Sequence, residues 1–310
     1  MKKKYLVTGA AGFIGSSIAK NLVSNNCEVW TIDNLSTGFI ENIPDGVEFI
    51  KGNCQNESSI NALKKTQFDA ILHFAGQSSG EISFDDPIYD LRTNTESTLN
   101  LINYALDNGC QRFIYASSMS VYGKVPDKPI PESFLCNPLS FYGVGKLASE
   151  HYLRIYQTKG LHPTILRIFN VYGPGQNLSN LRQGMVSIYL AQILKDEKII
   201  VKGSPDRFRD FIYIDDVVRL TIMILNSKVG IGMNYNIGTG TKTTVREVLD
   251  KLIKQHGKEI KVKFIDPTPG DQLGIRANTE LLHNDFEIND LVDFNSGLKK
   301  MVNWAKNSIV

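Results

Sequence analysis

The chain has 310 residues, of which 42% are hydrophobic and 21% are charged, and its formal net charge is +2 at pH 7. This length is enough to bury a substantial core, in one large domain or in two closely joined ones. The charge is spread along the chain without long basic tracts, which argues against nucleic-acid binding as the main function. No apolar run reaches the roughly 18 residues of a membrane span, and no signal peptide pattern opens the chain. We therefore expect a cytoplasmic protein with no membrane partner.

The expected elements of the first 170 residues alternate between β-rich and amphipathic helical runs. Strands are expected at residues 4–8, 28–32, 47–51, 69–74, 112–117 and 163–169, and helices at 13–25, 56–65, 94–108 and 140–158. This alternation predicts βαβ units and a parallel sheet with helices on both faces. Right-handed crossovers then require a doubly wound α/β sheet of the Rossmann type.

The second half of the chain is less regular. A loop is expected at residues 170–181, helices at 184–194, 215–226 and 245–256, short strands at 198–201 and 261–265, and a turn at 267–271. We predict a smaller, interleaved α/β domain here. The expected division is a first domain of residues 1–169, to which a segment of about 208–240 returns, and a second domain of residues 170–207 and 241–310.

The four cysteines are Cys27, Cys54, Cys110 and Cys136. No two of them are close enough in sequence for a redox or zinc pattern. We expect reduced thiols that pack as small apolar side chains, and no metal site.

A glycine-rich turn joins the first expected strand to the first expected helix, at residues 9–15 (GAAGFIG). Gly9 allows a sharp bend, Gly12 lets a pyrophosphate approach the main chain, and Gly15 lets the helix pack close to the strand. The free N–H groups at the helix start favour phosphate binding. Asp33 follows 18 residues after Gly15, at the end of the next strand, where a carboxylate accepts hydrogen bonds from ribose hydroxyls. Asn34 rather than Arg comes next, which favours NAD over NADP.

Two further strand ends supply candidate cofactor contacts. Asn53 and Cys54 follow the third strand, where they could meet the adenine. Residues 74–76 (Phe-Ala-Gly) follow the fourth strand, at the carboxyl edge where ligands bind in such sheets. His73, between Leu72 and Phe74, is expected to be a hydrogen-bonded core histidine rather than a catalytic one.

Tyr142 and Lys146 are four residues apart in an expected helix and so share a face. A tyrosine pKa near 10 makes a poor base, and lowering it to about 7 takes roughly 4 kcal/mol. The Lys146 ammonium together with a positive nicotinamide ring could supply this, so that the phenolate removes a hydroxyl proton. Ser117 and Ser118, just after the fifth strand, place hydroxyls where they could bind the reacting oxygen.

The ordered motifs resemble the extended short-chain dehydrogenase/reductase superfamily, specifically its NAD-dependent nucleotide-sugar epimerase/dehydratase family, of which UDP-glucose 4-epimerases are members. The resemblance covers nearly the whole chain and rests on residues 8–15, 33–38, 73–76, Asn94, 117–123, 142–146, 169–174 and 209–217. It implies an NAD-binding first domain and a second domain that binds a nucleotide-diphosphate sugar. It also implies a homodimer that packs the helices at 94–108 and 140–158.

The resemblance assigns roles to individual residues. The resemblance implies that Ser118, Tyr142 and Lys146 are the catalytic residues. NAD binding falls to Gly9, Gly12, Phe13, Ile14, Gly15, Asp33, Asn34, Ser36, Thr37, Gly38, Asn53, Cys54, Phe74, Ala75, Gly76, Asn94, Ser117, Tyr142 and Lys146. Substrate binding falls to Ser118, Asn170, Arg209, Arg207 and Asp271.

Positions where the chain departs from the family pattern help to distinguish among the reactions of the family. Met119 and Ser120 stand where 4,6-dehydratases carry an acid pair, so dehydration is not expected. Thr268 replaces an arginine of the 4-epimerases, and Lys202 stands where an aromatic residue often meets the base. The leading hypothesis is a 4-epimerase that forms a transient 4-keto sugar. The alternatives are a 4-ketoreductase or 4-dehydrogenase with the same chemistry, and a non-catalytic NAD-binding scaffold, which would not need Tyr142 and Lys146.

Overall fold

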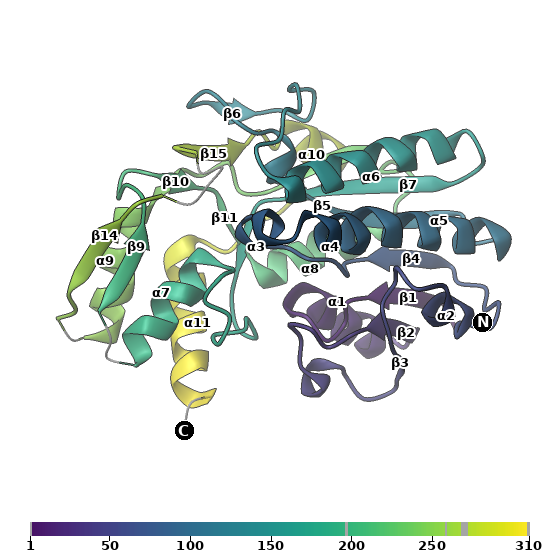
Figure 1. The fold of residues 1–310 in the computed structure, drawn as a ribbon, viewed down its shortest axis with the longest axis horizontal. Coiled ribbons are helices and arrows are strands. Elements are labelled where there is room, and N and C mark those ends of the chain that lie inside the picture. The colour runs from purple at the N-terminus through teal and green to yellow at the C-terminus, as the bar shows by residue number, and fades with distance from the viewer. Residues whose placement is uncertain (1, 196–197, 258, 268–271, 309–310) are drawn as a thin grey trace.

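The computed structural model describes residues 2–195, 198–257, 259–267 and 272–308. Its central feature is a seven-stranded parallel sheet in the order β12-β7-β5-β4-β1-β2-β3 (Figure 1). The strands are β1 (Lys4–Thr8), β2 (Glu28–Asp33), β3 (Val47–Lys51), β4 (Ala70–His73), β5 (Arg112–Ser118), β7 (His162–Ile168) and β12 (Asn234–Ile237). The order reverses at β1, so a crevice forms beyond the carboxyl ends of β1 and β4. The predicted Rossmann-type α/β class is confirmed.

Helices cover both faces of this sheet because its strands are apolar on both sides. Tyr5 and Val7 of β1 pack with α1 (Phe13–Ser24) and α8 (Ile214–Leu225). Leu6, between them, points to the opposite face and packs with side chains of α5 (Ser97–Asp107) and α6 (Phe141–Gln157). This alternation follows from the two-residue period of a strand. The short helix α2 (Glu57–Asn61) contributes Ile60 to the same face as Leu6.

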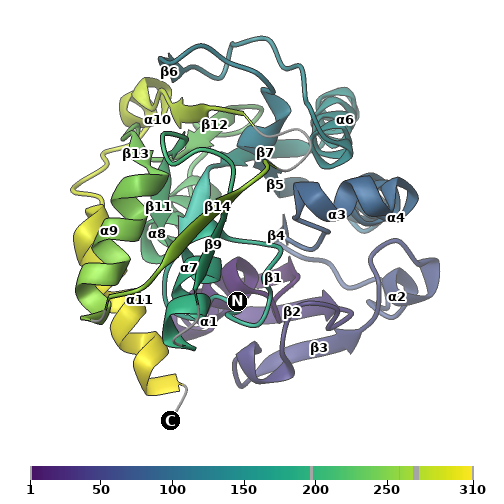
Figure 2. The ribbon, with the colours of Figure 1, turned by 60° about the vertical axis from the view of Figure 1, so that its left-hand side comes forward.

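A second set of elements lies beside the sheet (Figure 2). It contains the helices α7 (Met185–Leu194), α9 (Val245–His256), α10 (Glu280–Asp285) and α11 (Phe294–Ser308). Its strands form three small sheets: β9 (Ile199–Lys202) with β14 (Val262–Ile265), β8 (Asn170–Tyr172) with β11 (Phe211–Tyr213), and β13 (Thr243–Thr244), β10 (Phe208–Arg209), β15 (Gly274–Ala277) and β6 (Pro129–Ile130) in that order. β6 thus crosses from the N-terminal part of the chain to pair with β15.

Several expectations from the sequence are wrong in detail. The helix expected to begin at Asn94 begins earlier, with α4 (Pro87–Leu91), and continues through a π-helical turn (Arg92–Glu96) into α5. Asp86 caps α4 by accepting the Tyr89 N–H, and Pro87 occupies its first turn. This Asp-Pro pair is a local helix-start signal in the sequence. The helix α3 (Gly80–Asp85), the strands β8 and β12 and the helix α11 were also not predicted. The expected turn at 267–271 lies almost entirely outside the described residues.

Two expectations about buried residues are confirmed. His73 is buried, its Nδ1 lies 2.7 Å from Thr8 Oγ1 and its Nε2 lies 3.3 Å from Ser97 Oγ. Burial, and then the charge of Lys146, lowers the pKa of His73 to about 3, so this ring is neutral at physiological pH. All four cysteines are free thiols, of which Cys54 and Cys110 are buried and Cys27 and Cys136 are only partly buried. Within the described part of the chain, no helix combines the length and apolar character that crossing a membrane requires.

Candidate active site

A cavity of about 370 Å³ opens at the carboxyl edge of the central sheet. The glycine turn and the ends of β2, β4 and β5 form one side of it, and the loop before α7 forms the other. Residues with assigned roles that line it are Gly9, Gly12, Phe13, Ile14, Gly15, Asp33, Asn34, Ser36, Thr37, Gly38, Asn53, Cys54, Phe74, Ala75, Gly76, Ser117, Ser118, Tyr142, Lys146 and Asn170. Residues that are far apart in sequence therefore share one cleft.

The glycine turn forms a tight backbone cradle in this cleft. Gly9 has φ +77°, and its N–H donates to Ile32 O at 3.0 Å. A Cβ at Gly15 would lie 2.2 Å from Gly9 O, and a Cβ at Gly38 would lie 2.4 Å from Ala11 O. Gly12, the residue before α1, has no side chain that could cap the helix. Gly12 and the first residues of α1 line the cleft, so the positive end of the helix faces it. An anionic group such as a pyrophosphate fits this position.

Asp33 holds the cradle and also faces the cleft. Its Oδ2 accepts the N–H of Ala11 at 2.9 Å, and its Oδ1 accepts the N–H of Leu35 at 2.8 Å. A carboxylate oxygen can accept a second hydrogen bond, so both oxygens keep capacity for ribose hydroxyls. Next to it, Asn34 Nδ2 donates to Asn53 Oδ1 at 2.6 Å, which joins the ends of β2 and β3. The cradle and this carboxylate together match the needs of NAD.

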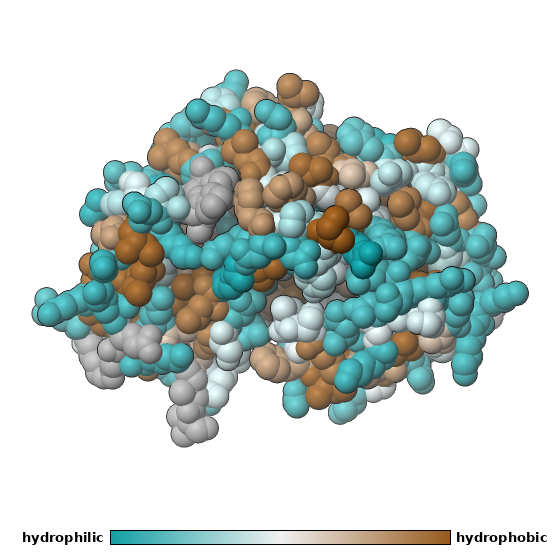
Figure 3. Space-filling model, in the orientation of Figure 1, coloured by the Kyte–Doolittle hydropathy of each residue, from teal (hydrophilic) through white to brown (hydrophobic). Residues whose placement is uncertain are grey.

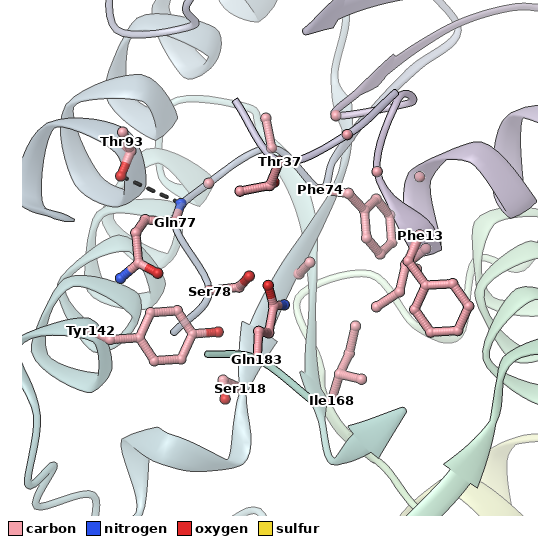
Figure 4. A pocket seen from close by; sticks show the side chains of 18 of the residues that line it. Phe13, Thr37, Phe74, Gln77, Ser78, Thr93, Ser118, Tyr142, Ile168 and Gln183 are labelled. Atoms are coloured by element: carbon pink, nitrogen blue, oxygen red, sulfur yellow. Dashed lines mark hydrogen bonds between the residues drawn. The ribbon is translucent and has the colours of Figure 1, made fainter. Parts of the chain in front are cut away.

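Ser118 and Tyr142 come to the cleft from different elements. Ser118 ends β5, and Tyr142 lies in the first turn of α6, which Ser140 caps by accepting the Gly143 N–H at 3.1 Å. A Cβ at Gly143 would lie 2.6 Å from Ser120 O, so the glycine allows α6 to approach the end of β5. Figure 4 shows the Tyr142 hydroxyl pointing into the cavity, on the side of Ser118.

Lys146 is buried directly behind this hydroxyl pair. Its Nζ donates to Ala116 O at 2.9 Å and lies 5.8 Å from the ring centroid of Tyr142. Burial lowers the pKa of Lys146 to about 8, against an opposing effect of Asp90. Burial raises the pKa of Tyr142 to about 12, and Asp90 adds to the rise, while a hydrogen bond with Ser118 opposes it. The protein alone therefore does not produce the pKa near 7 expected for the base, and further positive charge in the cleft is required.

The expected substrate contacts are only partly brought together. Asn170 lines the cleft, and its buried Oδ1 has no hydrogen-bond partner among the described residues, as expected of an atom that awaits a ligand. Arg207 and Arg209 are largely buried beside the cleft but do not line it. Arg209 Nη1 donates to Phe208 O at 2.8 Å, and Arg207 Nε donates to Ser204 O at 3.3 Å. Asp271 lies outside the described residues.

One further assignment, that of Asn94, changes with the structure. Asn94 does not line the cleft but lies beneath it, where its Nδ2 donates to Gln77 O at 2.9 Å. Lys202, which stands where an aromatic residue often meets the base, forms an ion pair with Glu81 at 2.8 Å. The Asn94 side chain thus supports the wall of the cleft from behind.

Polar residues that the sequence analysis missed complete the cleft. Gln77 and Ser78 follow the predicted Gly76, and Gln183 faces them from the loop before α7 (Figure 4). The N–H of Gln77 donates to Thr93 Oγ1 at 3.4 Å, which ties this wall to the π-helical turn. The available sequence signal for Gln77 and Ser78 was their place directly after Phe74-Ala75-Gly76, and no such signal marked Gln183. The Ser78 hydroxyl and the Gln183 amide suit the hydroxyls of a sugar, whereas the Gln77 amide is bound to Asp90 and Ser79 behind the cleft wall.

Comparison with known proteins agrees with this geometry. The NAD dependent epimerase/dehydratase family matches residues 5–238. The UDP-glucose 4-epimerase of Mycolicibacterium smegmatis is 31% identical to this chain over 97% of it and 98% of the relative. The Thermotoga maritima UDP-glucose 4-epimerase, solved with UDP-glucose, superimposes with a TM-score of 0.93 at 31% identity, covering 99% of this chain and 100% of the other. The Thermus thermophilus UDP-glucose 4-epimerase, solved with NAD, gives 0.90 at 32% identity, with 98% and 99% covered. The chain therefore belongs to the NAD dependent epimerase/dehydratase family and is an NAD-dependent enzyme of the extended short-chain dehydrogenase/reductase type.

Proposed function

We propose that this enzyme is a 4-epimerase of a nucleotide-activated sugar, with a UDP-hexose as the first substrate to test. One observation carries the proposal: the hydroxyls of Ser118 and Tyr142 lie on one side of a cavity that begins at the glycine cradle, with Lys146 buried behind them. The names of the similar enzymes from Mycolicibacterium, Thermotoga and Thermus support the same choice.

In the proposed mechanism the chain binds the sugar and moves one proton. When the sugar binds, Ser118 turns its hydroxyl proton from Ser120 Oγ to the oxygen on C4. Tyr142 removes the proton from that oxygen and later returns it. Lys146 stabilises the Tyr142 phenolate, and Asn170 holds the substrate diphosphate. Bound NAD supplies a hydride acceptor that also adds the positive charge needed near the phenol. We further infer that residues 170–207 and 241–310 form the part of the enzyme that holds the sugar nucleotide.

The residues next to Ser118 favour epimerisation over dehydration. Met119 and Ser120 line the cleft at the end of β5, and neither side chain can act as a general acid or base for water loss. Ser120 Oγ accepts a hydrogen bond from Ser118 Oγ at 3.2 Å, so this residue orients its neighbour. At this position the protein offers a 4-keto sugar no acid–base group that could catalyse water loss. The 4-keto sugar is therefore reduced again.

The test is anaerobic incubation of the purified, NAD-loaded enzyme with UDP-glucose and UDP-galactose, and with their N-acetylated forms. We expect interconversion of one such pair at C4 without net change in the absorbance of reduced cofactor. Stoichiometric appearance or loss of that absorbance would instead identify a 4-dehydrogenase or 4-ketoreductase. Failure to alter any nucleotide sugar would contradict the proposal.

We also propose a homodimer. The resemblance implies an interface of the helices at 94–108 and 140–158; we place it on the second of these, α6, together with α4, which precedes the first. These two helices lie side by side and expose apolar side chains that belong to none of the described hydrophobic clusters: Ile88, Leu91, Val144 and Ile155, with 52–61% of each exposed. Phe84, Phe141 and Tyr152 extend the face, and apolar side chains are visible there in Figure 3. An exposed apolar patch of this kind marks an interaction site.

Val144→Glu is expected to convert the dimer to a monomer. A carboxylate buried without a partner costs about 3 kcal/mol, which weakens association about a hundredfold. Sedimentation velocity over a range of concentrations measures this. Val229→Glu, at a comparably exposed valine in the loop after α8, is the matched control and should stay dimeric. A dimeric Val144→Glu protein, or a monomeric wild type, would reject this interface.

A further inference from the structure

A buried carboxylate lies behind the cleft and has no part in the mechanism above. Asp90 of α4 is only 1% exposed and does not line the cavity. Its Oδ1 accepts hydrogen bonds from Gln77 Nε2 at 2.8 Å and from Asn94 Nδ2 at 3.1 Å. Its Oδ2 is buried and has no hydrogen-bond partner among the residues that the structure describes. Burying a carboxylate in this way is costly unless a nearby positive charge compensates it.

The positive charge that acts on this carboxylate is that of Lys146. A Cβ at Gly145, the residue before Lys146, would lie 3.3 Å from Asp90 Oδ2, so the carboxylate packs directly against the first turns of α6. A Cβ at Gly76 would lie 2.5 Å from Asn94 Oδ1 and 3.6 Å from Lys146 Nζ. Asp90 and Asn94 therefore form a packed layer behind the cleft, and Asn94 Oδ1 and Lys146 Nζ pack against the backbone of Gly76 in the cleft wall.

The electrostatics of this layer agree with its geometry. The charge of Asp90 raises the pKa of Lys146 and that of Tyr142. Burial raises the pKa of Asp90 itself, while Gln77, Lys146 and Asn94 lower it. The other ionisable groups around Lys146 are His73 on β4, which is neutral, and Tyr115 on β5, whose ring centroid lies 5.0 Å from the ammonium and whose own pKa is raised by burial. Asp90 is thus the negative charge of this layer.

We propose that Asp90 is a positioning residue that acts through the charge of Lys146: it keeps the buried ammonium protonated behind Tyr142. This inference rests on the proposed function, because it concerns the proton transfer assigned to Tyr142. Gln77 connects the buried Asp90 to the cleft, because its side chain binds Asp90 and its backbone lies in the cleft wall. Asp90 therefore sets the pH range of the reaction without touching the substrate.

Asp90→Asn tests the proposal, since it removes the charge and keeps the shape. Without the carboxylate the pKa values of both Tyr142 and Lys146 fall, so both limbs of the kcat–pH profile should move to lower pH by about one unit. On the alkaline limb kcat then falls about tenfold at a given pH, and on the acid limb it rises about tenfold. KM should stay unchanged. Tyrosinate absorbance of the NAD-loaded protein gives a readout without substrate, and the Tyr142→Phe protein supplies the baseline. In Asp90→Asn the pH midpoint of the Tyr142 signal should also move to lower pH.

The matched control is Asp86→Asn, because Asp86 is an exposed carboxylate on the same segment and asparagine also caps a helix. It should leave the profile unchanged. An unshifted kcat–pH profile in Asp90→Asn, or an equal loss of activity at every pH, would overturn the inference. The proposed function would still stand in that case, because wild-type epimerisation tests it separately. If Asp90→Asn does not fold with NAD, Asp90→Ser takes its place. Failure of both to fold would assign Asp90 a structural role and also overturn the inference.

Discussion

Tyr142→Phe is expected to lower turnover about a thousandfold, the range lost when a general acid–base group is removed. The variant keeps the buried ring and its packing but lacks the oxygen that points into the cavity beside Ser118. The cofactor cradle lies on β1, β2 and α1, so NAD content should not change. Single-turnover and steady-state assays with the active UDP-sugar measure the loss, and mass analysis of the denatured protein measures bound NAD.

A second tyrosine in the same cleft provides the control. Tyr89 lines the cavity from α4 and carries no role in the mechanism, so Tyr89→Phe should retain turnover within a few-fold of wild type. If Tyr142→Phe kept more than about a tenth of the wild-type rate, the proton would have another carrier and the assigned base would be wrong.

Gly15→Ala is expected to remove NAD from the purified protein and to weaken its rebinding by about a hundredfold or more. The added Cβ would lie 2.2 Å from Gly9 O and 2.7 Å from Gly9 C, and these are backbone atoms that cannot rotate away. The turn must then move relative to α1, which also costs about 1–3 kcal/mol of folding free energy from overpacking. Cofactor content, NAD titration by fluorescence and urea unfolding report the two effects separately.

Ser17→Ala, two residues further along α1, is the matched control for this substitution. Ser17 Oγ only donates to Phe13 O at 3.0 Å within the helix, so its loss should leave NAD content and stability near wild type. Normal NAD content in Gly15→Ala would show that the cradle tolerates a displaced helix, and would contradict the packing argument.

The sequence predicted the regular elements best where local signals agree. The expected limits of β1, β3 and α9 match the structure residue for residue. In α9 the Thr244–Glu247 capping box and Gly257 in the left-handed conformation mark both ends, so the boundary is encoded within a few residues. The segment before Asn94 was harder to predict because α3, α4 and the π-helical turn are each about five residues long, too short for a helical period to appear.

By itself, the sequence determined the parts of this site that depend on neighbours in the chain. These are the glycine turn between strand and helix, Asp33 at the end of the next strand, and the four-residue spacing that places Tyr142 and Lys146 on one helical face. Backbone conformation and helical periodicity are local properties, so residue types and their spacing are sufficient to predict them.

Only the tertiary structure decided which distant groups meet and what charge they carry. Packing brings Ser118 to the side of Tyr142, places Asp90 against α6 and leaves Arg207 and Arg209 outside the lining of the cleft. The pKa of Tyr142 is raised rather than lowered in the protein alone, because the pKa depends on how completely the side chain is desolvated. Desolvation is set by atoms from many segments at once, and no spacing within one segment encodes it.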